Sequence, residues 1–281
     1  MSLQQNPAGD APATSMKVRV AAIQTVSGPD VAENLESAGR LVAEAAAAGA
    51  RLVALPEYFP LIAADDKEKV RIRETEGAGP IQDFMRETAR RHGVWLVGGT
   101  LPLVADAADK VRNSTLVFDD RGEQVARYDK IHLFGFQRGA ERYDESVTIE
   151  PGREVVRFDS PAGVTGLSVC YDLRFPELFR AFGEVDLIVL PAAFTYTTGR
   201  AHWEVLLRAR AIENLCYVLA PAQGGRHPTG RMTWGHSMIV DPWGEVLACR
   251  DEGPGVVIAE LDPARIAEVR ASLPALRHRC L

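Results

Sequence analysis

The stretch Leu52-Val-Ala-Leu-Pro-Glu-Tyr-Phe59 decides the fold, because it recurs as Leu187-Ile-Val-Leu-Pro-Ala-Ala-Phe194 in the second half of the 281-residue chain. Each copy is a continuous apolar run that a proline stops, which is typical of a strand buried on both faces. A second pair recurs in the same order, Asp119-Asp-Arg-Gly-Glu-Gln-Val-Ala126 and Asp241-Pro-Trp-Gly-Glu-Val-Leu-Ala248. A strand that ends in Leu-Pro and a hairpin with the pattern Asp-x-x-Gly are each common, so either match alone can arise by chance. Two matches in the same order favour an internal duplication.

Each half has the same predicted order of elements. A strand precedes an amphipathic helix (residues 30–50 and, shorter, 176–183), the Leu-Pro strand follows, and then come a second helix (81–92 and 202–214) and a hairpin. Alternating strands and helices predict an α/β fold in which helices cover a sheet. If the two halves bury their open sheet faces together, the result is a four-layer α-β-β-α sandwich.

The helix predicted over 202–214 has apolar residues at helical spacing. Val205, Leu206, Ala209 and Ile212 form this pattern and predict the face of the helix that packs against the protein. His202, at the predicted start, is expected to form a structural hydrogen bond there.

Composition excludes several classes of protein. With 46% hydrophobic and 25% charged residues, the chain is typical of a globular protein. Its net charge is -6 and its basic residues are dispersed, which predicts no nucleic-acid or membrane partner. Residues 1–16 are polar and rich in Ala and Pro, which predicts a flexible leader and not a signal peptide. Residues 17–281 then form a single domain, and no apolar stretch reaches membrane-spanning length.

The cysteines and histidines predict neither a disulfide framework nor a metal site. No CxxC pair and no HxxxH or HExxH pair occurs in the sequence. We therefore expect no metal, no cofactor and a reducing, cytoplasmic location. The four cysteines are Cys170, Cys216, Cys249 and Cys280.

Cys170 ends the short strand Val164-Thr-Gly-Leu-Ser-Val169, and a helix is predicted just after it, because Asp172, Pro176 and Glu177 are typical of a helix start. Backbone N–H groups of that first turn would lower the pKa of the thiol and offer an oxyanion hole. The alternative is a buried structural cysteine, since free Cys is among the most buried residue types.

Two further residues have a similar placement. Glu57 comes directly after the buried strand that Pro56 stops, and Lys130 lies between a polar hairpin and an apolar stretch, where it is expected to be partly desolvated. Taken singly, a glutamate such as Glu57 is more often a cap or surface charge, and a lysine such as Lys130 more often a solvated hairpin residue, than a catalytic group. The trio with Cys170 favours catalysis.

In their contexts these three residues resemble the nitrilase superfamily of carbon-nitrogen hydrolases, whose catalytic set is Glu, Lys and Cys in that order. The matching motifs are LPEYF, YDKIHLF and VCYDLRFPEL. The resemblance extends from about Lys17 to about Leu273. The superfamily also has a second glutamate before the nucleophile. Glu145 fits that position, with Glu141 and Glu150 as competitors. The resemblance implies the same four-layer sandwich.

Within the superfamily, residues 193–214, 222–227 and 234–244 are most similar to the branch of deaminated glutathione amidases and omega-amidases. The resemblance implies an amidase acting with water on a small carboxylate-bearing amide, such as deaminated glutathione or another 2-oxo acid amide, in metabolite repair. Other superfamily activities stay open: N-carbamoyl amino acid amidohydrolase, aliphatic amidase, nitrilase or acyltransferase. Papain-like chemistry with His132 or His236, and a non-catalytic scaffold, are further alternatives.

The resemblance also implies roles. Cys170 is the nucleophile that forms a thioester, and Glu57 is the general base. Lys130 and the N–H of Tyr171 hold the oxyanion, while Glu145 positions Lys130.

The substrate is expected to meet Tyr171, Arg174, Phe194 and Thr195. Arg174 would pair with a substrate carboxylate, although pairing with Glu177 on the surface is about equally compatible with the spacing. Phe194 and Thr195 line the pocket by the same resemblance. The superfamily further implies at least a homodimer.

Overall fold

Two sheets lie face to face in the computed structural model, which describes residues 16–139 and 141–280. The leader predicted over residues 1–16 therefore lies, except for Met16, outside the described residues. The first sheet has the order β17 (Gly255–Leu261), β1 (Val18–Gln24), β2 (Leu52–Ala54), β3 (Trp95–Val97), β5 (Val111–Phe118) and β4 (Leu101–Val104), with β6 (Gln124–Asp129) paired to β5. The second has the order β16 (Val246–Arg250), β15 (Ser237–Val240), β12 (Tyr217–Ala220), β11 (Leu187–Val189), β10 (Gly163–Leu167) and β9 (Arg157–Ser160).

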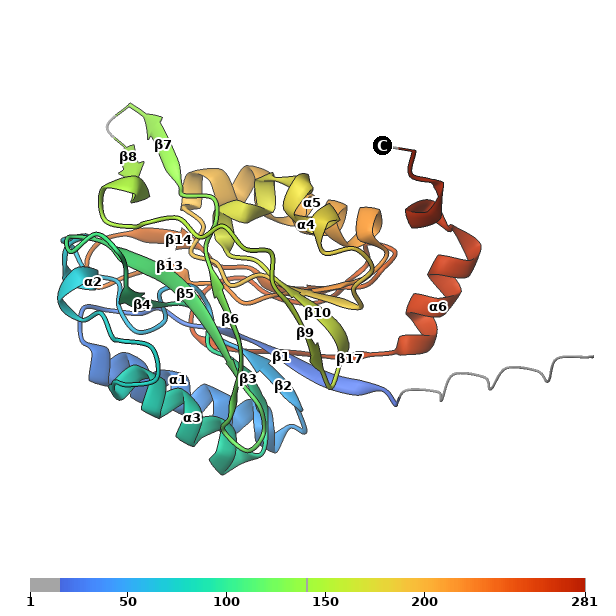
Figure 1. The fold of residues 1–281 in the computed structure, drawn as a ribbon, viewed down its shortest axis with the longest axis horizontal. Helices are drawn as coiled ribbons and strands as arrows, with labels where there is room; N and C mark the ends of the chain where they lie inside the picture. Colours follow the sequence, from blue (N-terminus) through green and yellow to red (C-terminus); the bar gives the residue numbers. More distant parts are fainter. Residues whose placement is uncertain (1–15, 140, 281) are drawn as a thin grey trace, which may run out of the picture.

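Helices cover the outer face of each sheet (Figure 1). Helices α1 (Val31–Ala47) and α3 (Pro80–His92) pack on the first sheet, and α4 (Pro176–Ala181) and α5 (Tyr196–Asn214) on the second. The predicted α-β-β-α sandwich is confirmed. The remaining elements are α2 (Glu68–Arg71), α6 (Pro263–Ser272), the short helices η1 (Glu145–Val147), η2 (Cys170–Arg174) and η3 (Ala275–His278), and the hairpins β7 (Gly135–Arg138) with β8 (Glu141–Asp144) and β13 (Gly224–Arg226) with β14 (Met232–Trp234).

The apolar run at β2 is explained by burial of both faces of this strand. Leu52 and Ala54 pack in the core between the sheets, whereas Val53 and Leu55 belong to the core under α1 and α3. Because successive side chains of a strand point to opposite faces, a strand in a middle layer must be apolar on both.

The two halves repeat the order that the sequence predicts. β2 and β11 are each parallel middle strands, and the hairpins β5–β6 and β15–β16 follow in the same order. The last strand, β17, leaves the second half and pairs antiparallel with β1, which joins the halves. The sequence patterns predict none of the strands β3, β12 and β17.

Helix α5 differs from the prediction in its start and its buried face. It begins at Tyr196, six residues before the predicted start at 202, because the side chain of Thr195 caps it by accepting from Thr198 N–H. His202 is therefore inside the helix. Gly199, in the first turn of this helix, lies where Trp234 packs, and a Cβ there would come within 2.2 Å of Trp234 Cβ.

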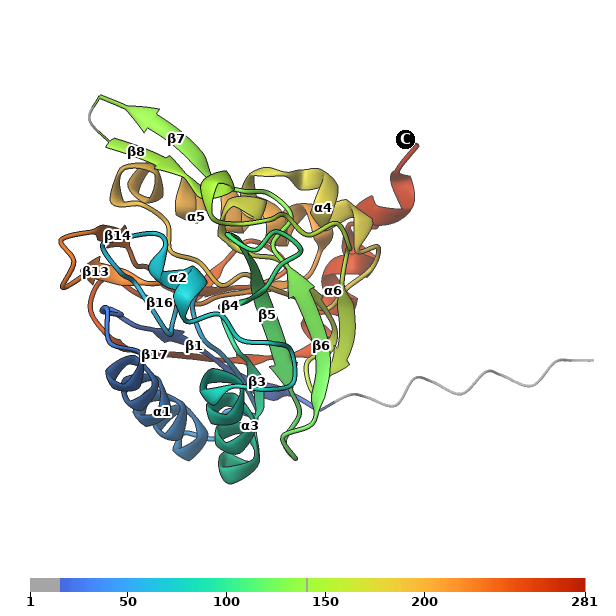
Figure 2. The ribbon, with the colours of Figure 1, turned by 60° about the vertical axis from the view of Figure 1, so that its left-hand side comes forward.

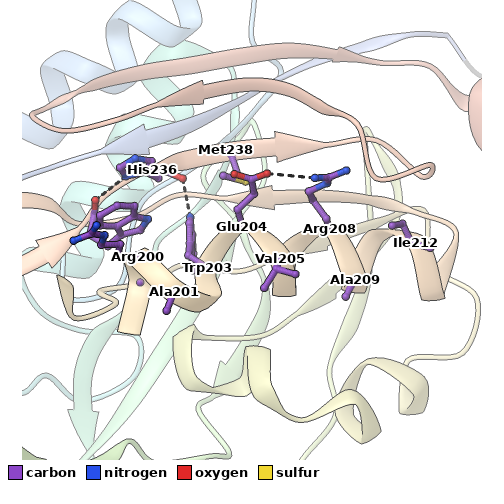
Figure 3. Close-up of a pocket in the computed structure, with 12 residues that line it drawn as sticks. Arg200, Ala201, Trp203, Glu204, Val205, Arg208, Ala209, Ile212, His236 and Met238 are labelled. Carbon is purple, nitrogen blue, oxygen red and sulfur yellow. Dashed lines mark hydrogen bonds and ion pairs between the residues drawn. The ribbon is translucent and has the colours of Figure 1, made fainter. Parts of the chain in front are cut away.

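The buried stripe of α5 consists of Trp203, Leu207 and Ala211. Val205 and Ile212, predicted to pack inward, are 62% and 44% exposed. The prediction was wrong for these two residues, whereas Leu206 is partly buried and packs against the core as predicted. Helix α5 carries two apolar stripes, and spacing alone does not say which one faces the sheet. Figure 3 shows Trp203 pointing toward the strand that carries Met238, whereas Val205 and Ala209 point away from it.

Neither a membrane-spanning helix nor a metal-binding cluster is found in the part of the chain that the structure describes. Within residues 16–139 and 141–280, no helix is long and apolar enough to cross a membrane. The same residues contain no group of three or more His, Cys, Asp or Glu side chains that could hold a metal ion.

Candidate active site

Cys170 lies at the turn from β10 into η2 with a φ of 50°, a left-handed conformation that is uncommon for a residue other than glycine. Its N–H donates to the carbonyl of Pro191 over 2.9 Å, which ties the turn to the end of the neighbouring strand. The residue is only 7% exposed. The fold thus holds the thiol in one place at the edge of the second sheet.

Glu57 comes to the same edge from the first sheet and is fully buried. Its carboxylate accepts from Lys130 Nζ over 2.9 Å, from Asn113 Nδ2 over 3.0 Å and from Ala193 N–H over 2.9 Å. Ala193 belongs to the repeated Leu-Pro stretch of the second half. The duplicated strand end therefore supplies a backbone donor to the carboxylate of the first half.

Lys130 is fully buried after β6, where it bridges two carboxylates. Its Nζ is 2.9 Å from Glu57 Oε1 and 2.8 Å from Glu145 Oε2. Burial lowers the pKa of Lys130, but the charges of Glu145 and Glu57 outweigh burial and leave the pKa raised above its ordinary value. Lys130 is thus a cation at neutral pH.

Glu145, at the start of η1, is the second glutamate of this cluster. It also accepts from Tyr58 Oη and from Phe134 N–H, each over 2.7 Å. Burial raises the pKa of Glu145, but the charge and hydrogen bond of Lys130 outweigh burial, so the pKa is lowered overall. The competing residues lie elsewhere: Glu141 accepts from Thr197, and Glu150 pairs with Arg112.

The thiol of Cys170 has a raised pKa, contrary to the prediction. Burial is the largest cause, the charge of Glu57 adds to it, and the opposing effect of Lys130 is smaller. The prediction considered only the N–H groups of the following turn, and one of these, that of Cys170 itself, is bonded to Pro191. At neutral pH the sulfur therefore rests as a neutral thiol, and a nearby base is needed to ionise it.

All four residues predicted to meet the substrate line one small cavity with Cys170. It has a volume of about 10 Å³, room for one water molecule. An amide therefore enters only if side chains of the lining move. The lining residues are Phe134, Cys170, Tyr171, Arg174, Ala193, Phe194, Thr195 and Thr198.

Arg174 lies at this cavity with its guanidinium over two aromatic rings. The distance to the ring centre is 5.7 Å for Tyr171 and 5.4 Å for Phe194, and Nη1 is 3.2 Å from His202 Nδ1. Stacking of this kind restricts the direction of the guanidinium while leaving donors free.

The two histidines of the papain-like alternative have structural partners. His132 Nδ1 is 2.7 Å from Asp172 Oδ1, and its ring stacks on Phe175. His236 stacks on Trp234. Among the described residues neither histidine lines the cavity at Cys170.

Sequence reasoning missed several supporting residues. The buried carboxylate of Asp172 accepts from Tyr128 Oη and Val169 N–H as well as His132, and so fixes the turn after Cys170. Gln223 donates to the carbonyl of Glu57 over 3.1 Å, across 166 positions of sequence. The only signal was the Gln-x-Gly-x-His pattern at 223–227, which does not name the residue it contacts.

Comparison with known proteins tests the family prediction. The pattern of the carbon-nitrogen hydrolase family matches residues 19–271. The chain belongs to this family. Deaminated glutathione amidase of Synechocystis sp. (strain PCC 6803 / GT-S) is 43% identical to the chain over 265 residues, which are 92% of this chain and 97% of that protein.

Solved structures agree with this assignment. Nit3 of Saccharomyces cerevisiae, a member of branch 10 of the nitrilase superfamily, superposes with a TM-score of 0.85 at 31% identity, over 95% of this chain and 98% of that one. A variant of an amidase from Nesterenkonia sp. AN1 has a TM-score of 0.77 at 26% identity, over 95% and 98% of the two chains, and its active-site cysteine carries the acetamide moiety of fluoroacetamide. The predicted superfamily and its carbon-nitrogen hydrolase chemistry are confirmed.

Proposed function

We propose that this enzyme hydrolyses the amide bond of deaminated glutathione or a related 2-oxo acid amide through a thioester on Cys170. The observation that carries the proposal is the buried cation of Lys130 between Glu57 and Glu145, beside a thiol that shares its cavity with Arg174. The 43% identity to a deaminated glutathione amidase supports the substrate class.

The first half of the reaction forms the thioester. Glu57 takes the proton of the Cys170 thiol as the sulfur attacks the carbonyl carbon, because the raised pKa of the thiol makes a resting thiolate unfavourable. Lys130 and the N–H of Tyr171 stabilise the negative oxygen of the tetrahedral intermediate. The C–N bond then breaks as Glu57 returns the proton to the departing nitrogen.

The second half consumes water. Glu57 accepts a proton from a water molecule whose oxygen attacks the thioester carbonyl. The C–S bond then breaks to release the carboxylic acid, and Glu57 returns its proton to the sulfur, which regenerates the thiol. Glu145 keeps Lys130 in place through both halves, since it bonds Nζ with both carboxylate oxygens.

Arg174 is proposed to bind the carboxylate of the acyl half. Its stacked guanidinium beside Cys170 suits bidentate binding of a carboxylate. Phe194 and Thr195 would enclose the chain between that carboxylate and the reacting carbonyl.

The test measures release of 2-oxoglutarate from deaminated glutathione and from 2-oxoglutaramate in parallel. We expect turnover that Cys170→Ala abolishes and that Cys249→Ala, a change at an exposed cysteine, retains. Hydrolysis of an N-carbamoyl amino acid or a nitrile, with no reaction of either 2-oxo acid amide, would overturn the substrate assignment while leaving the family intact.

We further propose that two copies associate through the exposed stripe of α5. Val205, Ala209 and Ile212 line a hollow of about 470 Å³ together with Trp234 and Met238 (Figure 3). Exposed apolar side chains that gather at one hollow are typical of a protein interface. Light scattering is expected to give a mass of at least twice 30.6 kDa, and Val205→Glu is expected to lower it toward one chain. A single-chain mass for the unmodified enzyme would exclude this interface.

The location is proposed to be the cytoplasm. All four cysteines are free among the described residues. Free thiols, one of them proposed as the nucleophile, suit a reducing compartment.

A further inference from the structure

A second cavity, of about 310 Å³, adjoins the proposed catalytic cluster. Tyr58 and Glu145 of that cluster line it, and Phe134 lines both this cavity and the small one at Cys170. It reaches the size range of small-molecule sites, whereas the cavity at the thiol does not. The hairpin β7–β8, which projects beyond the sandwich in Figure 2, forms part of its wall through Arg142, Tyr143 and Asp144.

Two residues that line this cavity each have a buried polar atom with no hydrogen-bond partner among the described residues. These atoms are Arg231 Nε and Thr229 Oγ1, both from the connection between β13 and β14. Leaving a buried donor unsatisfied is unfavourable, so native proteins rarely do so without a reason. Both residues line the same cavity, which indicates an acceptor that binds there.

The charges in the cavity favour an anion. Its acidic residues already have partners: Glu145 binds Lys130, Asp66 pairs with Lys69, and Asp144 accepts from Ser146. The guanidinium of Arg231 instead lies 5.5 Å from the ring centre of Tyr143. A stacked guanidinium with an unused Nε is suited to bind a carboxylate.

We infer that Arg231 and Thr229 bind a carboxylate on the leaving amine of the substrate. This inference rests on the proposed function. In deaminated glutathione the leaving amine is cysteinylglycine, which ends in a carboxylate, whereas in 2-oxoglutaramate it is ammonia. The acyl half then occupies the side of Arg174, the amine half occupies the larger cavity, and the scissile bond lies between them, near Phe134.

The test compares kcat/KM for three substrates: deaminated glutathione, the same compound with its terminal carboxylate converted to an amide, and 2-oxoglutaramate. We expect the unmodified enzyme to favour the free acid over its terminal amide by about tenfold or more, as for a hydrogen-bonded charge. Arg231→Met is expected to remove this preference. It should also lower kcat/KM for deaminated glutathione about tenfold more than for 2-oxoglutaramate.

Arg226→Met is the matched control. Arg226 lies in the same hairpin, is exposed, and contacts Met232 instead of the cavity. Arg226→Met should leave two ratios of kcat/KM unchanged: that of the free acid to its terminal amide, and that of deaminated glutathione to 2-oxoglutaramate. Thr229→Val should shift the ratios in the same direction as Arg231→Met by a smaller factor, and it carries the test if Arg231→Met does not fold.

Two outcomes would overturn the inference alone. One is an unmodified enzyme that hydrolyses the free acid and its terminal amide equally well. The other is an Arg231→Met or Thr229→Val variant in which all three substrates lose kcat/KM by the same factor or none loses any. Absence of hydrolysis of all three substrates would overturn the proposed function together with this inference.

Discussion

Glu57→Gln is expected to lower kcat about 10³-fold, the range for loss of a general acid-base group. Gln is nearly the same size, and its single amide oxygen can still accept from Asn113 Nδ2 or from Ala193 N–H, but it cannot accept the proton of the thiol. Burial still raises the pKa of Cys170 when the charge of Glu57 is removed, so proton transfer from the thiol at the rate of turnover needs this base. Steady-state kinetics on 2-oxoglutaramate would measure the loss.

A second measurement distinguishes loss of the general base from misfolding of the Glu57→Gln variant. The charge of Glu57 is a cause of the raised pKa of Cys170, so removing it lowers that pKa. In Glu57→Gln the thiol should therefore be alkylated faster by iodoacetamide at neutral pH, although turnover is lost. Glu74→Gln is the control: this buried carboxylate bonds Ile81 N–H and Gln82 in α3, remote from the thiol, and its loss should leave kcat near normal. A kcat within tenfold of normal in Glu57→Gln would contradict the role.

Lys130→Met is expected to destabilise the fold by about 3–5 kcal/mol, the usual effect of removing one partner of a buried ion pair. Two carboxylates, those of Glu57 and Glu145, would remain buried without a cation. For a chain of this size the corresponding fall in Tm is about 10 °C. Thermal unfolding followed by circular dichroism would measure it. Lys17→Met, at an exposed lysine paired with Glu260, should change Tm little.

The stability of Lys130→Met should depend on pH in the opposite sense to the stability of the unmodified enzyme. In the latter the lowered pKa of Glu145 contributes stability above about pH 4.5 that is lost as the pH falls through the folded pKa. Without Lys130 the burial of Glu145 and its repulsion by the Glu57 carboxylate raise the pKa of Glu145, and stability is lost as the pH rises. The difference in Tm should therefore widen from about pH 5 to about pH 8. A constant difference, or none, would contradict the bridging role of Lys130.

The sequence predicted much of the architecture because its strongest signals are local. The runs ending at Pro56 and Pro191 are apolar on both faces of their strands, and this is possible only in a middle layer. Their repetition was sufficient to predict two halves and four layers. Glu57, directly after the first of these strands, and Cys170, at the end of the strand that begins at Val164, could be expected at one edge of the sandwich.

The rest depends on contacts between distant parts of the chain. The bond from Gln223 to Glu57 and the pairing of β17 with β1 have no local signature. The pKa of Cys170 depends on burial and on the charge of Glu57, both of which are set by the fold. The start of α5 was missed because Thr195 caps a segment whose glycine is needed for packing against Trp234.

The thioester mechanism is tested most directly by quenching the enzyme with acid during turnover of deaminated glutathione and measuring the mass of the peptide that contains Cys170. The mechanism predicts a 2-oxoglutaryl group on Cys170, formed in the unmodified enzyme and missing from Cys170→Ala, which has no turnover. An acyl group on another side chain, or normal turnover by Cys170→Ala, would contradict it.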